Sequence, residues 1–541
     1  MTQVTVLEHA GSRLDDAWQR LMTRPGARRA WEWGAPGLVM LTAALTRLVA
    51  LGHPHELVFD ETYYVKDAYT LSQLGYEGSW PAESNEAFEA GRPGVYLDDP
   101  SFIAHPPVGK WIIAAGLAVF GPADPVGWRI SVAISGVLLV LLTLLIAKRL
   151  FRSTLLASIA GGLIAIDGNA IVMSRVALLD TMLALLVLAG AGAVLLDRDG
   201  HRRRIEDWLA WRSGVPLPVA WGPVLWNRPW LLAAGVLFGL ASGVKWSGAY
   251  FLAVFAVYAL GSEVLARRRA GVRHWLGGTL LRQGPVTFLL TVPVAAAVYV
   301  ASWAGWFATS GGYYRQWIEQ DGGQPWTGAL AWVPYDVQNW WHYQASIYGY
   351  HVSEDSPHSY SANPLGWLFL VRPTSMYWHA NGNSAETILG LANPLIWWAA
   401  TAALGFLVYR AGRRLLGVAR VYVRGDHAGL PPASQVASRD AFILAGFAAG
   451  YLPWLLYLHR TVFNFYTIAF EPFLILALTS AIAAVHGRAG DPASRRTAGW
   501  RIVGGFLLAC VLLSLFFLPI WTGMEIPRWY MTLHFWFPSW V

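Results

Sequence analysis

Apolar stretches of about 17–25 residues, the length that spans a bilayer, recur along the chain between shorter polar segments. Each one predicts a membrane-spanning helix. Eleven spans are expected, near residues 35–52, 127–147, 154–173, 179–196, 229–245, 246–264, 284–306, 387–409, 440–457, 463–485 and 501–520. A further apolar stretch, Trp111 to Phe120, is too short to cross, and we expect it to be a helix lying in the membrane interface.

Two long segments, at about 53–124 and 308–386, interrupt this pattern and are rich in aromatic, histidine and acidic residues. Long loops of this kind more often carry function than merely connect helices. The pattern therefore predicts an all-α polytopic membrane protein. Its expected parts are an N-terminal segment (1–34), a transmembrane catalytic domain (35–521) and a C-terminal tail (522–541).

The distribution of Lys and Arg predicts the orientation of these spans. Basic clusters lie at 148–152, 198–204, 267–269, 410–414 and 488–496. With eleven spans they all fall on one side, which the positive-inside tendency assigns to the cytoplasm. The N-terminus is then cytoplasmic, and the C-terminus and both long loops are outside. Counting 111–120 as a span would put two of the clusters outside.

Composition excludes several classes of protein. The 541 residues are 55% hydrophobic and only 13% charged, whereas a soluble protein carries about a quarter charged residues. The single cysteine, Cys510, rules out a disulfide framework and a cysteine metal cluster. No cleavable signal peptide is expected, because the first 35 residues are polar and basic.

Two adjacent carboxylates, Asp60 and Glu61, follow the first span within the sequence VFDETYY. Neighbouring carboxylates repel, which raises the pKa of one of them, and apolar surroundings add to that shift. Such a carboxylate suits a general base. The alternative is a helix N-terminus, with Asp60 as the cap and Glu61 in the first turn. The local sequence leaves both interpretations open.

Other charged residues fall on the same predicted side as this acidic pair. Arg129, Arg175, Asp180 and Lys245 lie at the outer ends of spans, and Glu471 is expected inside the tenth apolar stretch, where an ionisable group is costly. Each alone could be an ion-pair member or an interfacial anchor. Together they place cations and acids at one interface, as a lipid-phosphate substrate requires.

Three motifs in order resemble the protein O-mannosyltransferases, GT-C membrane glycosyltransferases that use polyprenyl (dolichyl) phosphate mannose. They are FDETYY at 59–64, HPPVGK at 105–110 and SRVALLD at 174–180. The resemblance covers the chain from about residue 35. It continues through Lys245-Trp246-Ser247-Gly248, the aromatic residues 340–343, Asn393-Pro394 and the tryptophan-rich tail 529–540. The ordered set is more specific than any single motif.

The resemblance implies inverting transfer of mannose to Ser and Thr hydroxyls of secreted proteins, at the outer face of the cell membrane. It assigns Asp60 as the base, with Glu61 beside it positioning sugar or acceptor. The expected donor phosphate and sugar contacts are Arg129, His105, Lys245, Arg175 and Asp180. Further donor or acceptor contacts are expected at Tyr64, Lys110, His342 and Glu471.

The same resemblance implies two substrates, polyprenyl phosphate mannose and a secreted or translocating polypeptide, with the Sec translocon as a candidate partner. It requires no cofactor, although a divalent metal held by Asp60, Glu61 and Asp180 stays an open alternative. The loop at 308–386 is too short for the β-trefoil MIR domain of eukaryotic members. The chain therefore resembles the bacterial form, and its Ala, Arg, Gly and Trp content suits a GC-rich actinobacterium.

Two other functions compete with this interpretation. A GT-C enzyme that glycosylates a lipid or a cell-wall glycan would share the fold and the first acidic pair, but HPPVGK together with LLD favours the protein-directed family. A secondary transporter would show an inverted repeat and broken helices at the bilayer midplane. The sequence shows no such repeat, and its polar groups gather at one face.

Overall fold

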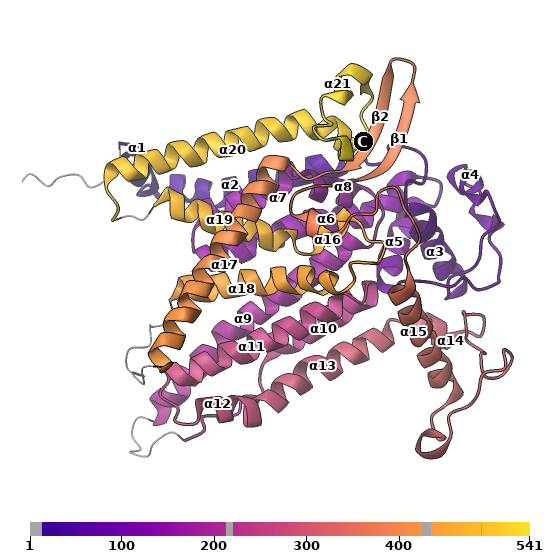
Figure 1. Ribbon diagram of the computed structural model, residues 1–541, viewed down its shortest axis with the longest axis horizontal. Helices are drawn as coiled ribbons and strands as arrows, with labels where there is room; N and C mark the ends of the chain where they lie inside the picture. Colours follow the sequence, from indigo (N-terminus) through magenta and orange to yellow (C-terminus); the bar gives the residue numbers. More distant parts are fainter. Residues whose placement is uncertain (1–12, 213–219, 424–433, 488–489) are drawn as a thin grey trace, which may run out of the picture.

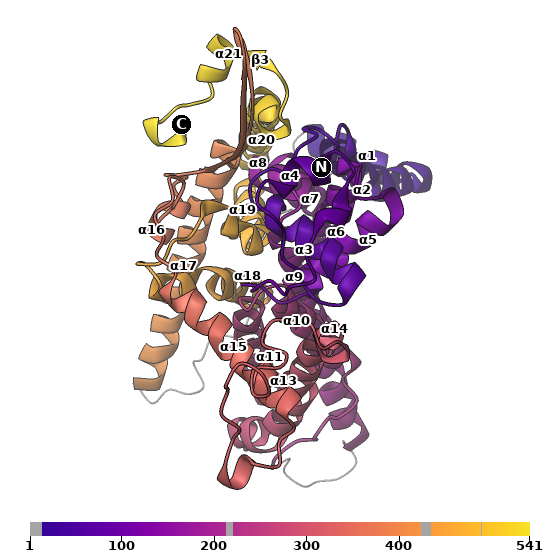
Figure 2. The same ribbon diagram turned by 90° about the vertical axis from the view of Figure 1, so that its right-hand side faces the viewer.

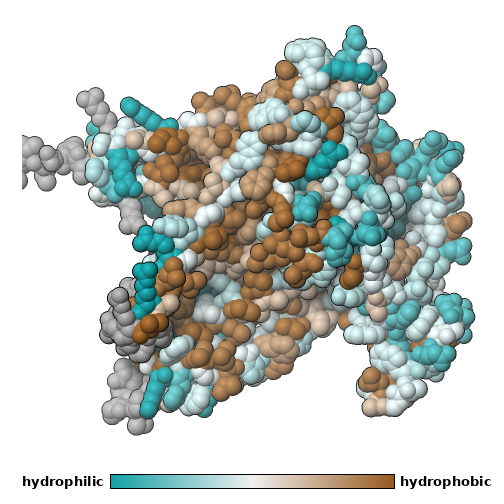
Figure 3. Space-filling model, in the orientation of Figure 1, coloured by the Kyte–Doolittle hydropathy of each residue, from teal (hydrophilic) through white to brown (hydrophobic). Residues whose placement is uncertain are grey.

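The computed structural model describes residues 13–212, 220–423, 434–487 and 490–541, and these are mostly helical. Long helices run side by side between two ends of the molecule (Figure 1), and one end carries α3 (Glu61–Leu74), α4 (Ser84–Glu89) and α15 (Tyr335–Ser353). Figure 2 looks onto that end. Apolar side chains cover much of the surface between the two more polar ends (Figure 3). This arrangement suits a protein embedded in a bilayer.

A helix occurs in every one of the eleven expected stretches. These helices are α2 (Pro25–Leu48), α6 (Pro125–Phe151), α7 (Thr154–Ile166) with α8 (Gly168–Arg175), α9 (Asp180–Arg212), α10 (Pro229–Val244), α11 (Gly248–Arg269), α13 (Gly284–Ala301), α17 (Pro394–Val423), α18 (Gln435–Tyr451), α19 (Glu471–His486) and α20 (Ala493–Thr522). Short α12 (Trp275–Gly277) and the π-helical turn η2 (Gly278–Gln283) lead into α13.

Six helices in the described residues are long and apolar enough to cross a membrane, or seven if α7 and α8 form one bent span. The protein is therefore a multi-pass membrane protein, and the count of eleven spans stays a prediction. Helix α5 (Val108–Phe120) has 13 residues, about 20 Å at 1.5 Å per residue. That length is shorter than the hydrocarbon core, and its expected place in the interface also stays a prediction.

The third expected span, 154–173, was wrong as a continuous helix, because the chain bends by 60° between α7 and α8. Asp167 lies at this bend, and its buried side chain accepts hydrogen bonds from the backbone N–H groups of Asn169 and Ala170. It also accepts one from the N–H of Asn393, at 3.0 Å. The carboxylate thus starts a new helix and ties it to the beginning of α17.

The start of the eighth expected span, 387–409, was also wrong. Strands β1 (Thr374–Asn381) and β2 (Ser384–Gly390) form an antiparallel hairpin here, joined on its other edge by β3 (Ile526–Pro527), and α17 begins only at Pro394. The turn Gly382-Asn383 connects the strands, and Gly382 has φ +53°. A two-residue loop with glycine at its first position is a favoured hairpin turn. The small sheet is an addition to the predicted all-helical fold.

Shorter elements complete the polar end and the turns. They are α1 (Arg13–Met22), η1 (Pro93–Val95), α14 (Ala304–Ala308), η3 (Gly328–Leu330), α16 (Pro364–Trp367), η5 (Leu452–Leu456), η6 (Asn464–Ala469), α21 (Arg528–Thr532) and η7 (Pro538–Trp540). Helix α9 packs against α6, α10 and α11 and is largely buried. Because Asp180 is its first residue, this central helix places one predicted site residue at the polar end.

Candidate active site

A cavity opens where α9 and α11 begin and α10 ends, next to α15 and the turn between α18 and α19. Its wall combines aromatic rings with a few charged and polar groups. The lining residues include His105, Asp180, Lys245, Trp246, Tyr250, Tyr348, His351, Trp454, Tyr457, Arg460 and Tyr466. A mostly apolar cavity with a few convergent polar groups is typical of a ligand site.

Lys245 and Asp180 form the ion pair at the base of this cavity. The Nζ of Lys245 is 2.7 Å from Oδ2 of Asp180, and both residues are buried. Lys245 lies between α10 and α11, and its ammonium also faces the ring of Tyr466 at 5.0 Å. Asp180 occupies one bond direction of the ammonium, so the lysine keeps further N–H groups for a ligand.

A second cationic group comes from Arg460, which the sequence analysis did not select. Its Nη2 donates to Nδ1 of His351 at 3.0 Å, and Nε2 of His351 donates to the carbonyl of Ala104 at 2.6 Å. This network requires a neutral imidazole, and burial together with Arg460 lowers the pKa of His351 to about 4. The Nε of Arg460 is buried without a partner in the described residues.

His105 stacks on His351, with ring centroids 5.2 Å apart. Burial first, and then the charge of Lys245, lowers the pKa of His105 well below its ordinary value. Its Nδ1 is buried and has no hydrogen-bond partner in the part of the chain that the structure describes. A neutral imidazole with an open ring nitrogen can still donate to, or accept from, a ligand in the cavity.

Asp60 lies beside the cavity in the turn before α3. It occupies the N-cap position of α3, but its side chain makes no capping hydrogen bond. Burial, and to a smaller degree the charge of Asp180, raises its pKa to about 6, against an opposing effect of Lys245. The preceding Phe59 has φ +51°, which is strained for an aromatic residue. Such strain is common at functional sites.

Glu61 points away from Asp60 and into the protein. It is fully buried and forms a bidentate pair with Arg129, with both N–O distances at 2.8 Å. Its two oxygens also accept from the backbone N–H groups of Val58 and Ala177. Glu61 therefore has no open lone-pair direction for a substrate. It ties the FDETYY turn to the chain just before Asp180.

The guanidinium donors of Arg129 are also all used within the protein. Besides the two bonds to Glu61, its guanidinium donates to the carbonyls of Leu51, Pro54 and Glu56, at 2.9–3.3 Å. These contacts use every N–H that a guanidinium offers, and the residue is buried. In this arrangement Arg129 holds the first loop in place and has no donor left for a phosphate.

Arg129→Met should therefore act mainly on stability. It leaves the buried Glu61 charge unpaired, which costs about 3–5 kcal/mol of unfolding free energy. Arg129→Met should lower the thermal midpoint in detergent, and adding Glu61→Gln should recover part of the loss. A stable Arg129→Met with a large increase in donor KM would contradict this and return Arg129 to the donor site.

The remaining predicted cations also lie outside the cavity. Arg175 donates to the carbonyls of Val49 and Ala50, at 2.8 and 2.9 Å, and thereby completes the end of α2. The Nζ of Lys110 lies 3.0 Å from carboxylate oxygens of both Asp67 and Glu77. Both side chains join elements of the fold, and neither lines the cavity.

His342 and Glu471 are likewise outside the lining, whereas Tyr64 is near it. The imidazole of His342 stacks on Trp317 at 3.6 Å. Glu471 was expected inside an apolar span, but it is the first residue of α19, where Oε2 accepts from Asn169 at 2.9 Å. The ring of Tyr64 lies 6.1 Å from that of His105.

Comparison with known proteins shows the family of this chain. Residues 37–220 match the family model "Dolichyl-phosphate-mannose-protein mannosyltransferase", and residues 336–540 match "C-terminal four TMM region of protein-O-mannosyltransferase". A polyprenol-phosphate-mannose–protein mannosyltransferase of Mycobacterium tuberculosis is 32% identical over 525 residues, covering 94% of this chain and 92% of the relative. The chain belongs to the protein O-mannosyltransferase family.

Other relatives agree with this membership. The Corynebacterium glutamicum polyprenol-phosphate-mannose–protein mannosyltransferase is 30% identical, and the match covers 97% of this chain and 94% of the relative. The Pmt1–Pmt2 protein O-mannosyltransferase complex of Saccharomyces cerevisiae, solved with its sugar donor, has a TM-score of 0.68 at 14% identity, with 98% and 94% coverage. That likeness shows the fold, and the predicted GT-C class is confirmed.

Arg460 and Tyr466 are the residues that the motif analysis of this family member missed. Arg460 belongs to the turn between the ninth and tenth expected spans, which the predicted topology already placed on the outer side, whereas Tyr466 falls at the beginning of the tenth expected span. An arginine in such a short outer turn was the available signal. It carried no motif of its own, and only the packing of α15 against this turn places Arg460 beside His351.

The metal alternative finds no support in the arrangement of these acids. Among the described residues, no group of three or more His, Cys, Asp or Glu side chains is placed to hold a metal ion. Glu61 is occupied by Arg129, and Asp180 is paired with Lys245. The three carboxylates proposed as ligands therefore do not converge as arranged here.

Proposed function

We propose that this protein transfers mannose from polyprenyl phosphate mannose to Ser and Thr hydroxyl groups of secreted proteins, with inversion at the anomeric carbon. Membership of the family and the names of its relatives support the donor and the protein acceptor. The observation that carries the proposal is the position of Asp60. Its carboxylate makes no capping hydrogen bond and has a raised pKa, and it lies beside a cavity that two cations line.

The donor phosphate is assigned to Lys245, Arg460 and His105. Lysine and arginine attract the phosphate charge, and arginine adds a fork of N–H donors that matches two phosphate oxygens. The open Nδ1 of His105 supplies a further polar contact. Asp180 keeps the Lys245 ammonium in place. Arg129, Arg175 and Glu61 are positioning residues because their polar atoms are already used within the protein.

In the reaction, Asp60 removes the proton from an acceptor hydroxyl as its oxygen attacks C1 of mannose. The bond between C1 and the phosphate oxygen breaks, and its electron pair stays with the phosphate. The leaving polyprenyl phosphate gains one negative charge. Cations already in place at that oxygen stabilise the charge as it develops, so Lys245 and Arg460 favour the transition state over the bound donor.

The pH dependence of transfer should report the pKa of Asp60. A base acts only when deprotonated, so kcat/KM should rise with pH through about 6 and level off above it. An ordinary aspartate, with a pKa near ~3.9, would give a flat profile over the same range. Rates measured between about pH 5 and 8, near the raised pKa, distinguish the two. A kcat/KM that does not fall toward the acidic end of this range would contradict the assignment of Asp60 as the base.

An assay with purified protein tests the function itself. The protein would be incubated with radiolabelled polyprenyl phosphate mannose and a peptide rich in Ser, Thr, Pro and Ala. Label is expected in the peptide, and β-elimination should release it as mannose. The second candidate function, a lipid or cell-wall glycan acceptor, would instead place the label in lipid or glycan. Label there and none in the peptide would overturn protein O-mannosylation.

The orientation is proposed from the basic clusters. We place residues 1–34 in the cytoplasm and the cavity, both long loops and residues 522–541 outside the cell membrane, in line with the positive-inside tendency. The acceptor is then a polypeptide that is leaving the cell, and the Sec translocon is the proposed partner that delivers it.

Cysteine labelling in intact cells tests this orientation. The native Cys510 is buried and should give little background. Asp355→Cys and Thr532→Cys, both at exposed positions, should react with an impermeant thiol reagent. Gly490→Cys, where an added side chain meets open space, should react only after the cells are permeabilised. Labelling of Gly490→Cys in intact cells, with protection of the other two, would invert the topology.

A further inference from the structure

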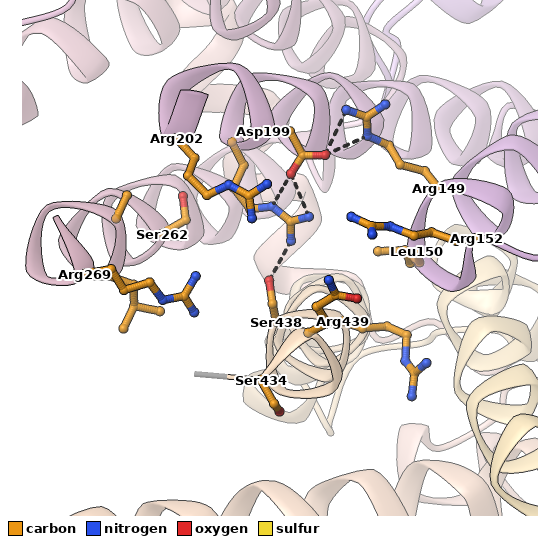
Figure 4. A pocket seen from close by; sticks show the side chains of 14 residues that line it. Arg149, Leu150, Arg152, Asp199, Arg202, Ser262, Arg269, Ser434, Ser438 and Arg439 are labelled. Carbon is orange, nitrogen blue, oxygen red and sulfur yellow. Dashed lines mark hydrogen bonds and ion pairs between the residues drawn. The ribbon is translucent and has the colours of Figure 1, made fainter. Parts of the chain in front are cut away.

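A second cavity, which we call the arginine pocket (Figure 4), lies at the end of the helix bundle opposite the active-site cavity. Four helices, α6, α9, α11 and α18, bring arginines to it. These are Arg149, Arg152, Arg198, Arg202, Arg269 and Arg439. None of these residues belongs to the cavity beside Asp60, and the proposed transfer reaction uses none of them.

The position of the arginine pocket follows from the helices that it shares with the active-site cavity. Helix α11 contributes Tyr250 to the active-site cavity and Arg269 to the arginine pocket. At 1.5 Å per residue, the helical rise between them is about 28 Å. This is close to the thickness of the hydrocarbon core, about 30 Å. The arginine pocket therefore lies at the other membrane interface.

The charges in the arginine pocket are not balanced by its own side chains. Among the described lining residues, Asp199 is the single carboxylate and six residues are arginines, of which Arg439 turns its guanidinium away to Ser480. It pairs with Arg149 at 2.8 Å (Figure 4) and also with Arg198 at 3.0 Å. The guanidinium of Arg152 makes no hydrogen bond or ion pair within the described part of the chain. Holding so many like charges together costs free energy that a bound anion would offset.

Topology and helix dipoles explain only part of this cluster. Arg149 and Arg269 lie in the last turns of α6 and α11, where a cation is favoured. Arg198 and Arg202 are inside α9, however, so no helix terminus accounts for them. Arg439 is in the second turn of α18, near the end where a cation is disfavoured. The presence of Arg198 and Arg202 beside Arg149, Arg152 and Arg269 at one pocket calls for another reason.

We propose that the arginine pocket binds a phosphate group at this second interface. Arginine forks match phosphate oxygens, and basic pockets between helices at a membrane surface receive phosphate-bearing lipid headgroups. The guanidinium groups of Arg152 and Arg202 belong to exposed residues and are accessible to a ligand. The side chain of Gln435 adds a neutral donor at the beginning of α18. The same chemistry would accept a soluble phosphate.

Ligand binding to the purified full-length protein in a neutral detergent tests this site. Phosphatidylglycerol is the lipid probe, phosphatidylcholine its zwitterionic control, and inorganic phosphate the soluble probe. Arg152→Gln/Arg202→Gln removes two exposed arginines and should leave the fold intact. Its matched control is Arg413→Gln/Arg420→Gln, which removes two exposed arginines from α17 outside the arginine pocket. Native mass spectrometry and the ligand-dependent thermal midpoint report binding.

The pocket variant should bind phosphatidylglycerol, or inorganic phosphate if the ligand is soluble, at least about tenfold more weakly than the wild type does. The reason is that contacts to a charged group are individually strong. The control should bind like the wild type. Arginine-dependent binding of phosphatidylglycerol, without competition by inorganic phosphate, identifies a lipid. Arginine-dependent binding of inorganic phosphate identifies a soluble ligand.

Two results would overturn the site. One is equal binding of both probes by the pocket variant and its control, and the other is failure of the wild type to bind either probe. If the double variant loses its monodisperse gel-filtration peak, Arg202→Gln alone provides the same comparison. Among the described residues, the side chain of Arg202 makes only a long contact, 3.7 Å, with the exposed Glu206.

Discussion

Replacing Asp60 by Asn should reduce mannosyl transfer by at least about a hundredfold. General-base catalysis contributes about 10²–10⁴ in rate, and the amide keeps the shape of the carboxylate but cannot take the proton. Donor affinity should change much less, because Lys245 and Arg460 hold the phosphate while the base acts on the acceptor. The measurement is kcat and the donor saturation curve, on protein shown to be folded in detergent.

Asp124→Asn is the matched control for this substitution. Asp124 is also an N-cap carboxylate on the same side of the protein, and its side chain accepts from the N–H of Val126 at 2.8 Å. Asparagine caps a helix about as well as aspartate, so this variant should keep wild-type activity. Asp60 makes no such capping bond. If folded Asp60→Asn is as active as Asp124→Asn, the base must be sought at Asp180.

Removing Arg460 should have the second largest effect. Loss of one preorganised group that stabilises transition-state charge costs about 10²–10³ in kcat, so Arg460→Ala should reduce kcat/KM by at least that range. Arg460→Lys should recover part of the activity, because an ammonium retains the charge but not the paired N–H donors. The side chain is half-buried, with His351 as its hydrogen-bond partner, so the fold should persist.

Arg528→Ala is the control for a lost positive charge at the same end of the molecule. Arg528 is exposed at the start of α21 and lies outside the active-site cavity. Its removal should leave kcat and donor KM near the wild-type values. Similar losses in the Arg460 and Arg528 variants would mean that general electrostatics decides the rate. In that case the assignment of Arg460 to the donor phosphate would fail.

Much of the site could be predicted because its residues lie in sequence motifs at the ends of apolar stretches. Hydropathy placed Asp60, Asp180 and Lys245 on one side of the membrane, and the structure brings the charges of all three close enough to act on one another. The same reasoning could not decide which of the cations line the cavity. Arg129, Arg175 and Lys245 all end or begin spans on that side, but only Lys245 lines the cavity.

The predicted boundaries of helices were wrong where a polar side chain or a turn interrupts an apolar stretch. Asp167 breaks an apolar stretch because its carboxylate satisfies the N–H groups that start a new helix. The stretch after residue 387 reads as the start of a span, yet it pairs with β1 around a Gly-Asn turn. Glu471 follows the 3₁₀ turn η6 and begins a helix instead of lying within one.

The sequence by itself determined the membrane character, the family and the acidic turn that carries Asp60, because hydrophobic transfer and short motifs depend on nearby residues. Only the tertiary structure decided which charged groups remain open to a ligand. A guanidinium is chemically the same at Arg129 and Arg460, but the carbonyls of the first loop and Glu61 use every donor of Arg129. Partners far apart in the chain, and not residue type, separate a positioning residue from a ligand-binding one.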